Sequence, residues 1–346
     1  MFDVTPEKYA SRIHGLKRTF FETPPIITKS DADLTGKTAI VTGVGRGIGI
    51  NIARQLLDLG LSKLIIGARV KAKGKATAKL LSDEKKLPVG AVEVWSLDLL
   101  TYDSIIKFAQ RAQQLERLDI VVLNAEIINR HSWINATTHH EAHMQINYLS
   151  TALLLLLLLP VIESKNSPSA PGKITVTSSD WSNLAIIPEQ NKSLLLTALD
   201  DQAAEVDNSV SVYGATKLMG QLFIAELARR VPPSVAIVNG GCPGFCHSTG
   251  LFPDLHSSSW KEYPVNLGLH LIGRAPEVGA RVLIDAATRW REESHGKIID
   301  GGKVRPMANF VYTPRGEKVR QQLWKETMDE LSFAKVEEIV QVLSYR

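Results

Sequence analysis

The sequence has few of the residues that characterise disulfide-rich, metal-binding or nucleic-acid-binding proteins. Its 346 residues include only two cysteines, Cys242 and Cys246, so a disulfide framework like that of secreted scaffolds is not expected. Together with His247, these cysteines are too few to complete a tetrahedral metal site. The net charge is only +4, and no basic run is interleaved with aromatic residues. We therefore expect no bound metal ion and no nucleic-acid partner.

Long hydrophobic runs are missing as well. The seven leucines of Leu153–Leu159 end at Pro160, and this run is shorter than the roughly 20 apolar residues that span a bilayer. The run predicts a helix buried on most sides, against a sheet and, as a further candidate, a second subunit. No signal-like segment is recognisable near the N-terminus. We expect a cytoplasmic protein without an integral membrane segment.

The rest of the composition is that of an ordinary globular protein, with 44% hydrophobic and 22% charged residues. At about 150 residues per domain the length suggests two domains, but strand-like and helical segments alternate in one continuous pattern. Short crossovers between strands imply a parallel sheet with helices on both faces. We expect one α/β domain with seven strands, near residues 37–43, 63–68, 91–97, 118–124, 173–178, 235–240 and 296–300.

The first of these strands runs into a glycine-rich turn. The turn reads Thr42-Gly-Val-Gly-Arg-Gly-Ile-Gly49, and helical periodicity follows it from Ile52 to Leu59. Glycine lets the backbone approach a pyrophosphate closely, and a helix N-terminus presents N–H groups to it. Strand, glycine turn and helix in this order are the context of a dinucleotide fingerprint. The predicted dinucleotide site contains Gly43, Gly45, Arg46, Gly47, Ile48 and Gly49.

A second motif indicates proton chemistry. Tyr213 and Lys217 are four residues apart in a helical segment, so their side chains share one helix face. A cation beside a phenol favours the phenolate and lowers a pKa that is about 10 in water. Such a tyrosine can exchange a proton with a substrate oxygen near neutral pH. The alternative is a half-buried tyrosine beside a solvated lysine, which the spacing alone does not exclude.

Together, these motifs resemble the short-chain dehydrogenase/reductase family, from about Thr35 to about Gly302. Val176-Thr-Ser-Ser179 and Gln145-Ile-Asn147 look like the segments that carry the family's catalytic serine and asparagine. The resemblance implies a Rossmann-type, doubly wound domain with strand order 3-2-1-4-5-6-7. It implies four catalytic residues, namely Asn147, Ser179, Tyr213 and Lys217. Besides Tyr213 and Lys217, it adds cofactor contacts at Asp98, Leu99, Asn124, Ala125, Pro243, Gly244 and Thr249.

Closer still, the chain resembles the retinol-dehydrogenase-like branch of the family, and especially its fungal relatives. The cues are Phe20–Pro25, Ala68-Arg69 and Pro243–Ser248. Many such fungal enzymes act on carbonyl groups of polyketide or terpenoid intermediates, so the resemblance implies a bulky hydrophobic substrate. One residue departs from the family pattern, because Glu126 stands where the family usually has glycine.

Charge after the second strand favours NADP(H) over NAD(H). An NAD site usually places a carboxylate there, on the ribose hydroxyls. This chain instead has Gly67-Ala-Arg-Val-Lys71, without an acid. Arg69 could pair with a 2′-phosphate, and Arg46 of the glycine turn could add a contact. The alternative is that both arginines are simply solvated.

The resemblance implies an NADPH-dependent carbonyl reductase that can run in reverse as an alcohol dehydrogenase. Tyr213 would protonate the nascent alkoxide, and Lys217 would lower its pKa and hold the nicotinamide ribose. Ser179 would hydrogen-bond the substrate oxygen, and Asn147 would hold a water that links Lys217 to solvent. Two alternatives stay open. One is an isomerase or epimerase that works by transient oxidation, and the other is a non-catalytic nucleotide-binding protein, suggested by Glu126.

Around the expected catalytic domain of residues 34–302 lie an N-terminal extension, 1–33, and a helical C-terminal extension, 303–346. The N-terminal one could dock on the domain, line the substrate mouth or touch a membrane surface, and docking is the default. Two insertions, 180–211 and 245–274, leave the carboxyl ends of strands, where open α/β sheets bind ligands. We expect them to form an apolar substrate wall that includes Trp181, Leu184, Ile186, Phe245 and Phe252. In the family, the leucine-rich helix often forms the interface of a homodimer.

Overall fold

A computed structural model describes residues 2–129, 132–188, 194–205, 209–247, 249 and 273–346. Most of the expected insertion at 245–274, including Phe252, therefore lies outside the described residues.

The centre of the fold is one twisted sheet in the order β3-β2-β1-β4-β5-β6-β7-β8. Strands β1 to β7 pair in parallel, which confirms the expected Rossmann-type arrangement and strand order. The strands are β1 Thr38–Thr42, β2 Lys63–Ala68, β3 Val92–Ser96, β4 Ile120–Leu123, β5 Gly172–Thr177, β6 Ala236–Gly241, β7 Ile298–Asp300 and β8 Lys303–Arg305.

The predicted number of strands, seven, is wrong by one. After β7 the chain turns at Gly301-Gly302 and returns as β8, which pairs antiparallel with β7. A strand of three residues is too short to show an alternating pattern, and hairpin pairing depends on the turn rather than on hydrophobicity. Since β8 extends the sheet past residue 302, the C-terminal segment is part of the domain core as well as a helical extension.

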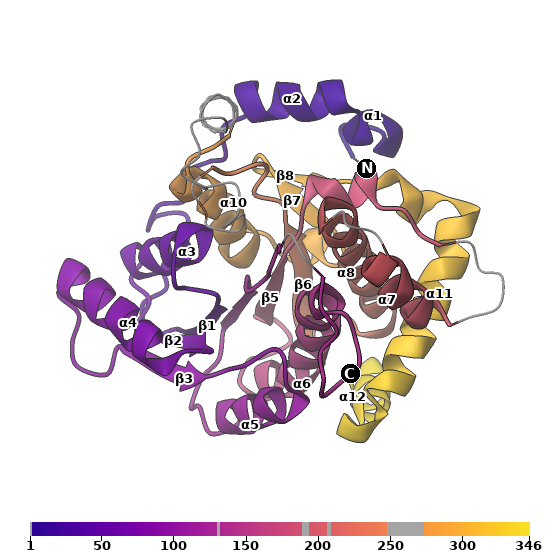
Figure 1. Cartoon of the computed structure of the whole chain (residues 1–346). Helices are drawn as coiled ribbons and strands as arrows, with labels where there is room; N and C mark the ends of the chain where they lie inside the picture. Colours follow the sequence, from indigo (N-terminus) through magenta and orange to yellow (C-terminus); the bar gives the residue numbers. More distant parts are fainter. Residues whose placement is uncertain (1, 130–131, 189–193, 206–208, 248, 250–272) are drawn as a thin grey trace, which may run out of the picture.

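Helices cover both faces of the sheet, as Figure 1 shows. Ala39 and Val41 of β1 pack with α3, α4 and α10, whereas Ile40 packs with α5, α6 and α8. This division follows from the strand geometry, because alternate side chains point to opposite faces. The helices of the two layers are α3 Gly47–Asp58, α4 Lys71–Lys85, α5 Tyr102–Ala112, α6 Ser150–Ser164, α8 Ser209–Arg230 and α10 Pro276–Thr288.

The leucine-rich helix is buried by this chain itself. A π-helical turn, Met144–Leu149, leads into α6, which continues through Pro160 to Ser164. Met144–Ser164 is long and apolar enough to cross a membrane, but 83% of its most apolar window is buried inside the protein. Helices α5 and α12 (Val336–Ser344) pack against α6. The chain's own C-terminal helix thus covers part of α6, and the expected homodimer stays a prediction.

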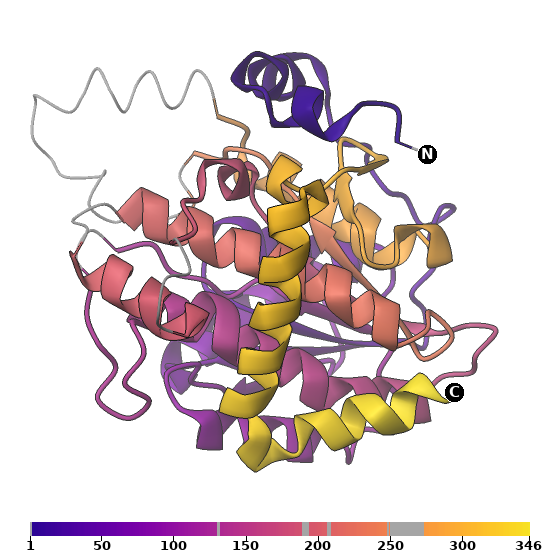
Figure 2. The ribbon, with the colours of Figure 1, turned by 90° about the vertical axis from the view of Figure 1, so that its right-hand side faces the viewer.

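Both terminal extensions pack on the domain. At the C-terminus, α11 (Pro314–Glu330) lies along α8, and Figure 2 shows it crossing that helical layer before α12. Tyr148 and Thr327 share a buried hydrogen bond of 2.6 Å between their hydroxyl groups. At the N-terminus, α1 (Pro6–Ala10) and α2 (Arg12–Phe21) lie across the end of the sheet where its parallel strands finish.

Aromatic packing joins α11 to the domain, and it gives a test of this arrangement. The ring of Trp324 is 7% exposed and stacks on Phe223 of α8, with 5.3 Å between the ring centroids. We expect Trp324→Ala to lower the free energy of unfolding by about 3–5 kcal/mol, since a buried aromatic is replaced by a cavity. Tyr345→Ala, at a ring that is 90% exposed, should change it by at most about 0.5 kcal/mol. Equal losses in urea unfolding would contradict the packing of α11.

Candidate active site

The side chains predicted to act in the site converge on the carboxyl ends of the parallel strands. Gly43 follows β1, Asn124 follows β4, Ser179 follows β5 and Pro243 follows β6. A cavity of about 380 Å³ opens among them. A second hollow, of about 610 Å³, lies near the amino ends of the strands and is lined by charged groups such as Lys37 and Arg117. Open α/β sheets bind ligands at their carboxyl edge, so the smaller cavity is the candidate site.

The glycine turn has the shape that a pyrophosphate needs. Gly47, the first residue of α3, has a φ of +59°, and a Cβ there would come within 2.6 Å of the Thr249 carbonyl oxygen. At Gly49 a Cβ would lie 2.0 Å from the carbonyl oxygen of Gly43. The N-terminus of α3 has no side-chain cap. These residues fit a dinucleotide, whose pyrophosphate would lie against the backbone at the start of α3.

The other predicted cofactor residues lie along the same edge. Asn124 and Ala125 both donate backbone N–H groups to the Thr42 hydroxyl, at 3.0 and 2.9 Å, so they tie β4 to β1 beneath the glycine turn. Asp98 follows β3, and its carboxylate accepts the backbone N–H of Leu100 at 3.0 Å. The remaining members of the set are Arg46, exposed before α3; Ile48, half-buried in α3; Arg69, exposed after β2; and Leu99, buried beside Asp98.

Tyr213 and Ser179 both line the cavity, and Lys217 lies one helical turn after Tyr213. Tyr213 and Lys217 both belong to α8, and the Lys217 ammonium donates to the Thr177 carbonyl at the end of β5, at 2.8 Å. Ser179 lines the same cavity as Tyr213, and its side chain lowers the pKa of the Tyr213 phenol. The neighbouring Ser178 hydroxyl instead accepts from Gln221 at 2.9 Å. Of the two serines, Ser179 is therefore the one that acts on the predicted proton donor.

Asn147 lies in the π-helical turn before α6, and its side chain holds a neighbouring loop. The carboxamide accepts the backbone N–H of Ile127 and donates to the Ile127 carbonyl, both at 2.9 Å. It also donates to Thr216 of α8 at 3.4 Å. Asn147 thus fixes the chain just after Glu126. Its predicted water-holding role stays a prediction.

Glu126 points into the cluster. Its carboxylate forms an ion pair with the Lys217 ammonium and accepts a hydrogen bond from the Tyr213 hydroxyl at 3.3 Å. The Glu126 side chain is 12% exposed, so this contact is shielded from water. The departure from glycine at this position marked Glu126 as unusual in the sequence. What sequence reasoning missed was that its charge meets the cation of the Tyr-Lys motif.

The expected effect of Lys217 on Tyr213 is wrong for this structure. Burial raises the pKa of Tyr213 well above its usual range, and the negative charge of Glu126 raises it further. The Ser179 hydrogen bond lowers the pKa of this phenol without cancelling those effects. Lys217 is neutralised by its ion pair, and its ammonium lies 5.4 Å from the centroid of the phenol ring. Tyr213 therefore carries its proton at neutral pH.

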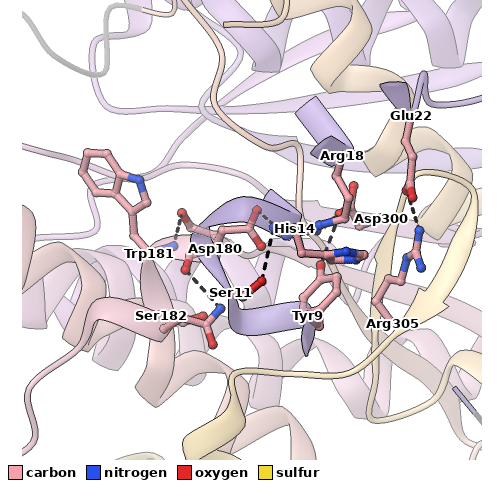
Figure 3. A network of polar contacts seen from close by, with 12 residues as sticks. Tyr9, Ser11, His14, Arg18, Glu22, Asp180, Trp181, Ser182, Asp300 and Arg305 are labelled. Atoms are coloured by element: carbon pink, nitrogen blue, oxygen red, sulfur yellow. Dashed lines mark hydrogen bonds and ion pairs between the residues drawn. The ribbon is translucent and has the colours of Figure 1, made fainter. Parts of the chain in front are cut away.

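The predicted substrate wall is formed only in part. Trp181, Leu184 and Phe245 line the cavity, and Trp181 packs edge-on against the Tyr213 ring at 5.7 Å between centroids. Ile186 is 61% exposed and is not among the lining residues that the structure describes. The facing wall comes from the N-terminal helices, which sequence reasoning placed only as one of three options. Figure 3 shows Arg18 of α2 reaching towards Asp180, beside Ser179.

Comparison with known proteins identifies the family. The chain is 37% identical over 345 residues to the short-chain dehydrogenase fogG of Aspergillus ruber, and the match covers 99% of each chain. The chain belongs to the short-chain dehydrogenase/reductase family. Residues 37–188 match a protein-family model that is described as "short chain dehydrogenase". The chain is also 36% identical over 325 residues to the short chain dehydrogenase/reductase mfmJ of Annulohypoxylon moriforme, covering 94% of this chain and 93% of that one.

Solved structures share the fold of this dehydrogenase. The short chain dehydrogenase from Shigella flexneri has a TM-score of 0.58 at 20% identity, over 83% of this chain and 99% of that one. The RhlG/NADP active-site complex of Pseudomonas aeruginosa has a TM-score of 0.57 at 23% identity, over 78% and 97%. At these identities the likeness concerns the fold alone.

The contact between Glu126 and Tyr213 predicts how the phenol titrates. In Glu126→Gln the carboxylate charge is gone, so we expect the pKa of Tyr213 to fall relative to that in the wild-type dehydrogenase. Ultraviolet titration of tyrosinate measures this, with the Tyr213→Phe variant subtracted to isolate the signal. Glu116→Gln, at an exposed position, is the matched control and should not move it. The same ionisation pH in wild type and Glu126→Gln would show that Glu126 does not act on the phenol.

Proposed function

We propose that this dehydrogenase is an NADPH-dependent reductase that converts a ketone of a bulky hydrophobic substrate into a secondary alcohol. The observation that carries the proposal is the pair Ser179 and Tyr213 lining the cavity, with Lys217 one helical turn away on α8. A proton donor and a hydrogen-bond donor there can act on one substrate oxygen.

Each residue of the cluster has a part in this reaction. NADPH, when bound along the glycine turn, supplies the hydride for the carbonyl carbon. Ser179 hydrogen-bonds the carbonyl oxygen and stabilises the charge that develops on it. Tyr213 donates its phenolic proton to that oxygen, which completes the alcohol. Lys217, held by the Thr177 carbonyl and by its ion pair with Glu126, places a positive charge 5.4 Å from the centroid of the phenol ring that has lost the proton. In this scheme Asn147 would hold the water that reprotonates the cluster.

The charge of the cluster supports reduction as the working direction. Reduction needs a protonated Tyr213, whereas alcohol oxidation needs a phenolate that can accept a proton. Burial and Glu126 both raise the pKa of Tyr213 and so keep the proton on the phenol at neutral pH. An alcohol oxidation catalysed by the same residues would be favoured only at alkaline pH.

The preference for NADPH is supported by charge. Arg69 is exposed directly after β2, where a 2′-phosphate would lie, and the chain has no acidic residue from Gly67 to Lys71. The Pseudomonas aeruginosa RhlG structure, which has a similar fold, is a complex with NADP. A guanidinium forms bidentate hydrogen bonds with a phosphate, which an NAD ribose does not offer.

The substrate class is supported by the cavity and by the relatives. A volume of about 380 Å³ falls in the range of small-molecule sites, and Trp181, Leu184 and Phe245 give it apolar walls. The fungal short-chain dehydrogenases fogG and mfmJ are similar over nearly the whole chain. We infer a polycyclic ketone of fungal secondary metabolism, polyketide- or terpenoid-like, that is reduced in the cytoplasm.

The role of Tyr213 is tested by removing one oxygen atom. We expect Tyr213→Phe to abolish ketone reduction while the Kd for NADPH stays close to that of the wild type, since the phenol acts on the substrate oxygen. Tyr345→Phe, at an exposed ring, should keep full activity. NADPH oxidation, measured across a panel of polycyclic ketones, gives the rates. Undiminished turnover in Tyr213→Phe would remove this residue from the mechanism, and turnover without net NADPH loss would favour the isomerase or epimerase alternative.

Cofactor preference is tested at Arg69. Losing a charge-assisted hydrogen bond costs about 1.5–3 kcal/mol, so Arg69→Ala should weaken NADPH binding by roughly tenfold to a hundredfold. The affinity for NADH, which lacks the 2′-phosphate, should change little. Lys107→Ala on α5 removes an exposed charge elsewhere and is the control. If Arg69→Ala weakened both cofactors equally, Arg69 would not recognise the phosphate.

A further inference from the structure

The N-terminal helices form one side of the candidate substrate cavity. Figure 1 shows α1 and α2 lying across the end of the sheet, and Figure 3 shows the polar contacts of Tyr9 and Arg18 beneath them. Trp181 and Leu184 lie on the other side, and the residues that α1, α2 and their junction contribute to the lining are Tyr9, Ala10, Ser11, Gly15 and Arg18.

Arg18 links the N-terminal helices to the carboxyl edge of the sheet, where Ser179 lies. Its guanidinium pairs with Asp180 at 3.0 Å and also with Asp300 at the end of β7, although Arg18 is only 3% exposed. The guanidinium stacks on the Tyr9 ring at 3.9 Å, and the Tyr9 hydroxyl donates to Asp300 at 3.2 Å. Asp180 directly follows Ser179, so one buried cation joins α2 to the turn that carries the substrate-binding serine.

Two arginines, one in the loop after β6 and one in β8, also bind the C-terminal end of α2. Arg274 donates to the backbone carbonyls of Arg18 and Glu22, at 3.0 and 2.8 Å. Arg305 of β8, which is 2% exposed, pairs with the Glu22 carboxylate at 2.5 Å. Removing one partner from a buried ion pair leaves an uncompensated charge, so such pairs oppose opening. The extension is therefore a fixed part of the site and not a loosely docked tail.

The size of the residue at position 15 determines how much space α2 leaves in the cavity. Gly15 lies in the interior of α2 and lines the cavity. Among the atoms that the structure describes, a Cβ at this position would meet only the Arg18 guanidinium, at 3.9 Å, which is an ordinary contact. Neither the backbone nor the packing requires glycine there, although glycine is a poor helix former. The absent side chain leaves space at the cavity.

We propose that residues 5–22 are a specificity-determining wall of the substrate site, in which Gly15 admits a bulky apolar group and Arg18 positions the Ser179–Asp180 turn. The inference rests on the proposed ketone reduction and adds the segment that selects the ketone. Phe21 is 82% exposed, so the segment is held through its buried charges and not through this ring.

The first test narrows the cavity. Gly15→Leu is compared with the wild-type dehydrogenase on cyclohexanone, a small ketone, and on tetralone, a bicyclic one. We expect kcat/KM for tetralone to fall by about tenfold or more relative to that for cyclohexanone, while NADPH affinity is unchanged. The matched control is Lys17→Leu, which adds a similar side chain at an exposed position of the same helix and should not alter the ratio. An unchanged ratio in Gly15→Leu would overturn the proposal.

The second test does not depend on turnover. Hydrogen exchange of the full-length wild type should show protected amides in α2, and Arg18→Met should increase exchange in α2 and in residues 180–184 together. Free exchange of α2 in the wild type, or an effect of Arg18→Met on α2 alone, would overturn the coupling. A wild type that reduces no ketone but protects α2 would contradict the proposed function and leave the wall in place. The two failures are therefore distinguishable.

Discussion

Parallel strand pairing is the constraint on which the rest of this structure depends. Because β1, β4, β5 and β6 run in the same direction, the segments that follow them emerge at one edge of the sheet. Parallel pairing alone therefore brings together residues that are distant in sequence, such as Thr42, Ser179 and Pro243. Helix α8 then needs only to pass this edge for Tyr213 and Lys217 to join them. The chemistry is local to an edge that the topology creates.

Charge compensation shapes what this edge can do. Lys217 is paired with Glu126, and Arg18 is paired with Asp180 and Asp300. These pairs compensate two cations at this edge, and apolar groups such as Trp181 also line the cavity. Burial and the Glu126 carboxylate both raise the pKa of Tyr213 and so keep its proton in place. In the function proposed above, the substrate class and the direction of the reaction would both depend on this arrangement.

The features that were predictable from the sequence are those with local causes. Short apolar runs predict the buried strands. The steric freedom of glycine predicts the tight turn, and the helical spacing predicts the Tyr213–Lys217 pair. The strand β8 was missed because three residues carry no pattern. The pKa of Tyr213 was predicted with the wrong sign because burial raises it and because Glu126 approaches the phenol from another strand end. The contact of Arg18 with Asp300 joins residues 282 positions apart, and no local signal encodes such a pairing.

This last separation has a consequence for the order in which the protein is made. Residues 5–22 are synthesised long before their partners Asp300 and Arg305. The strands up to β6 can pair before then, since domains form progressively as the chain emerges. The wall over the cavity, however, cannot be anchored until β7 and β8 exist. A nascent chain would therefore hold paired strands around the glycine turn while the opposite side of the cavity is still open, and that side can close only after β8 has been made.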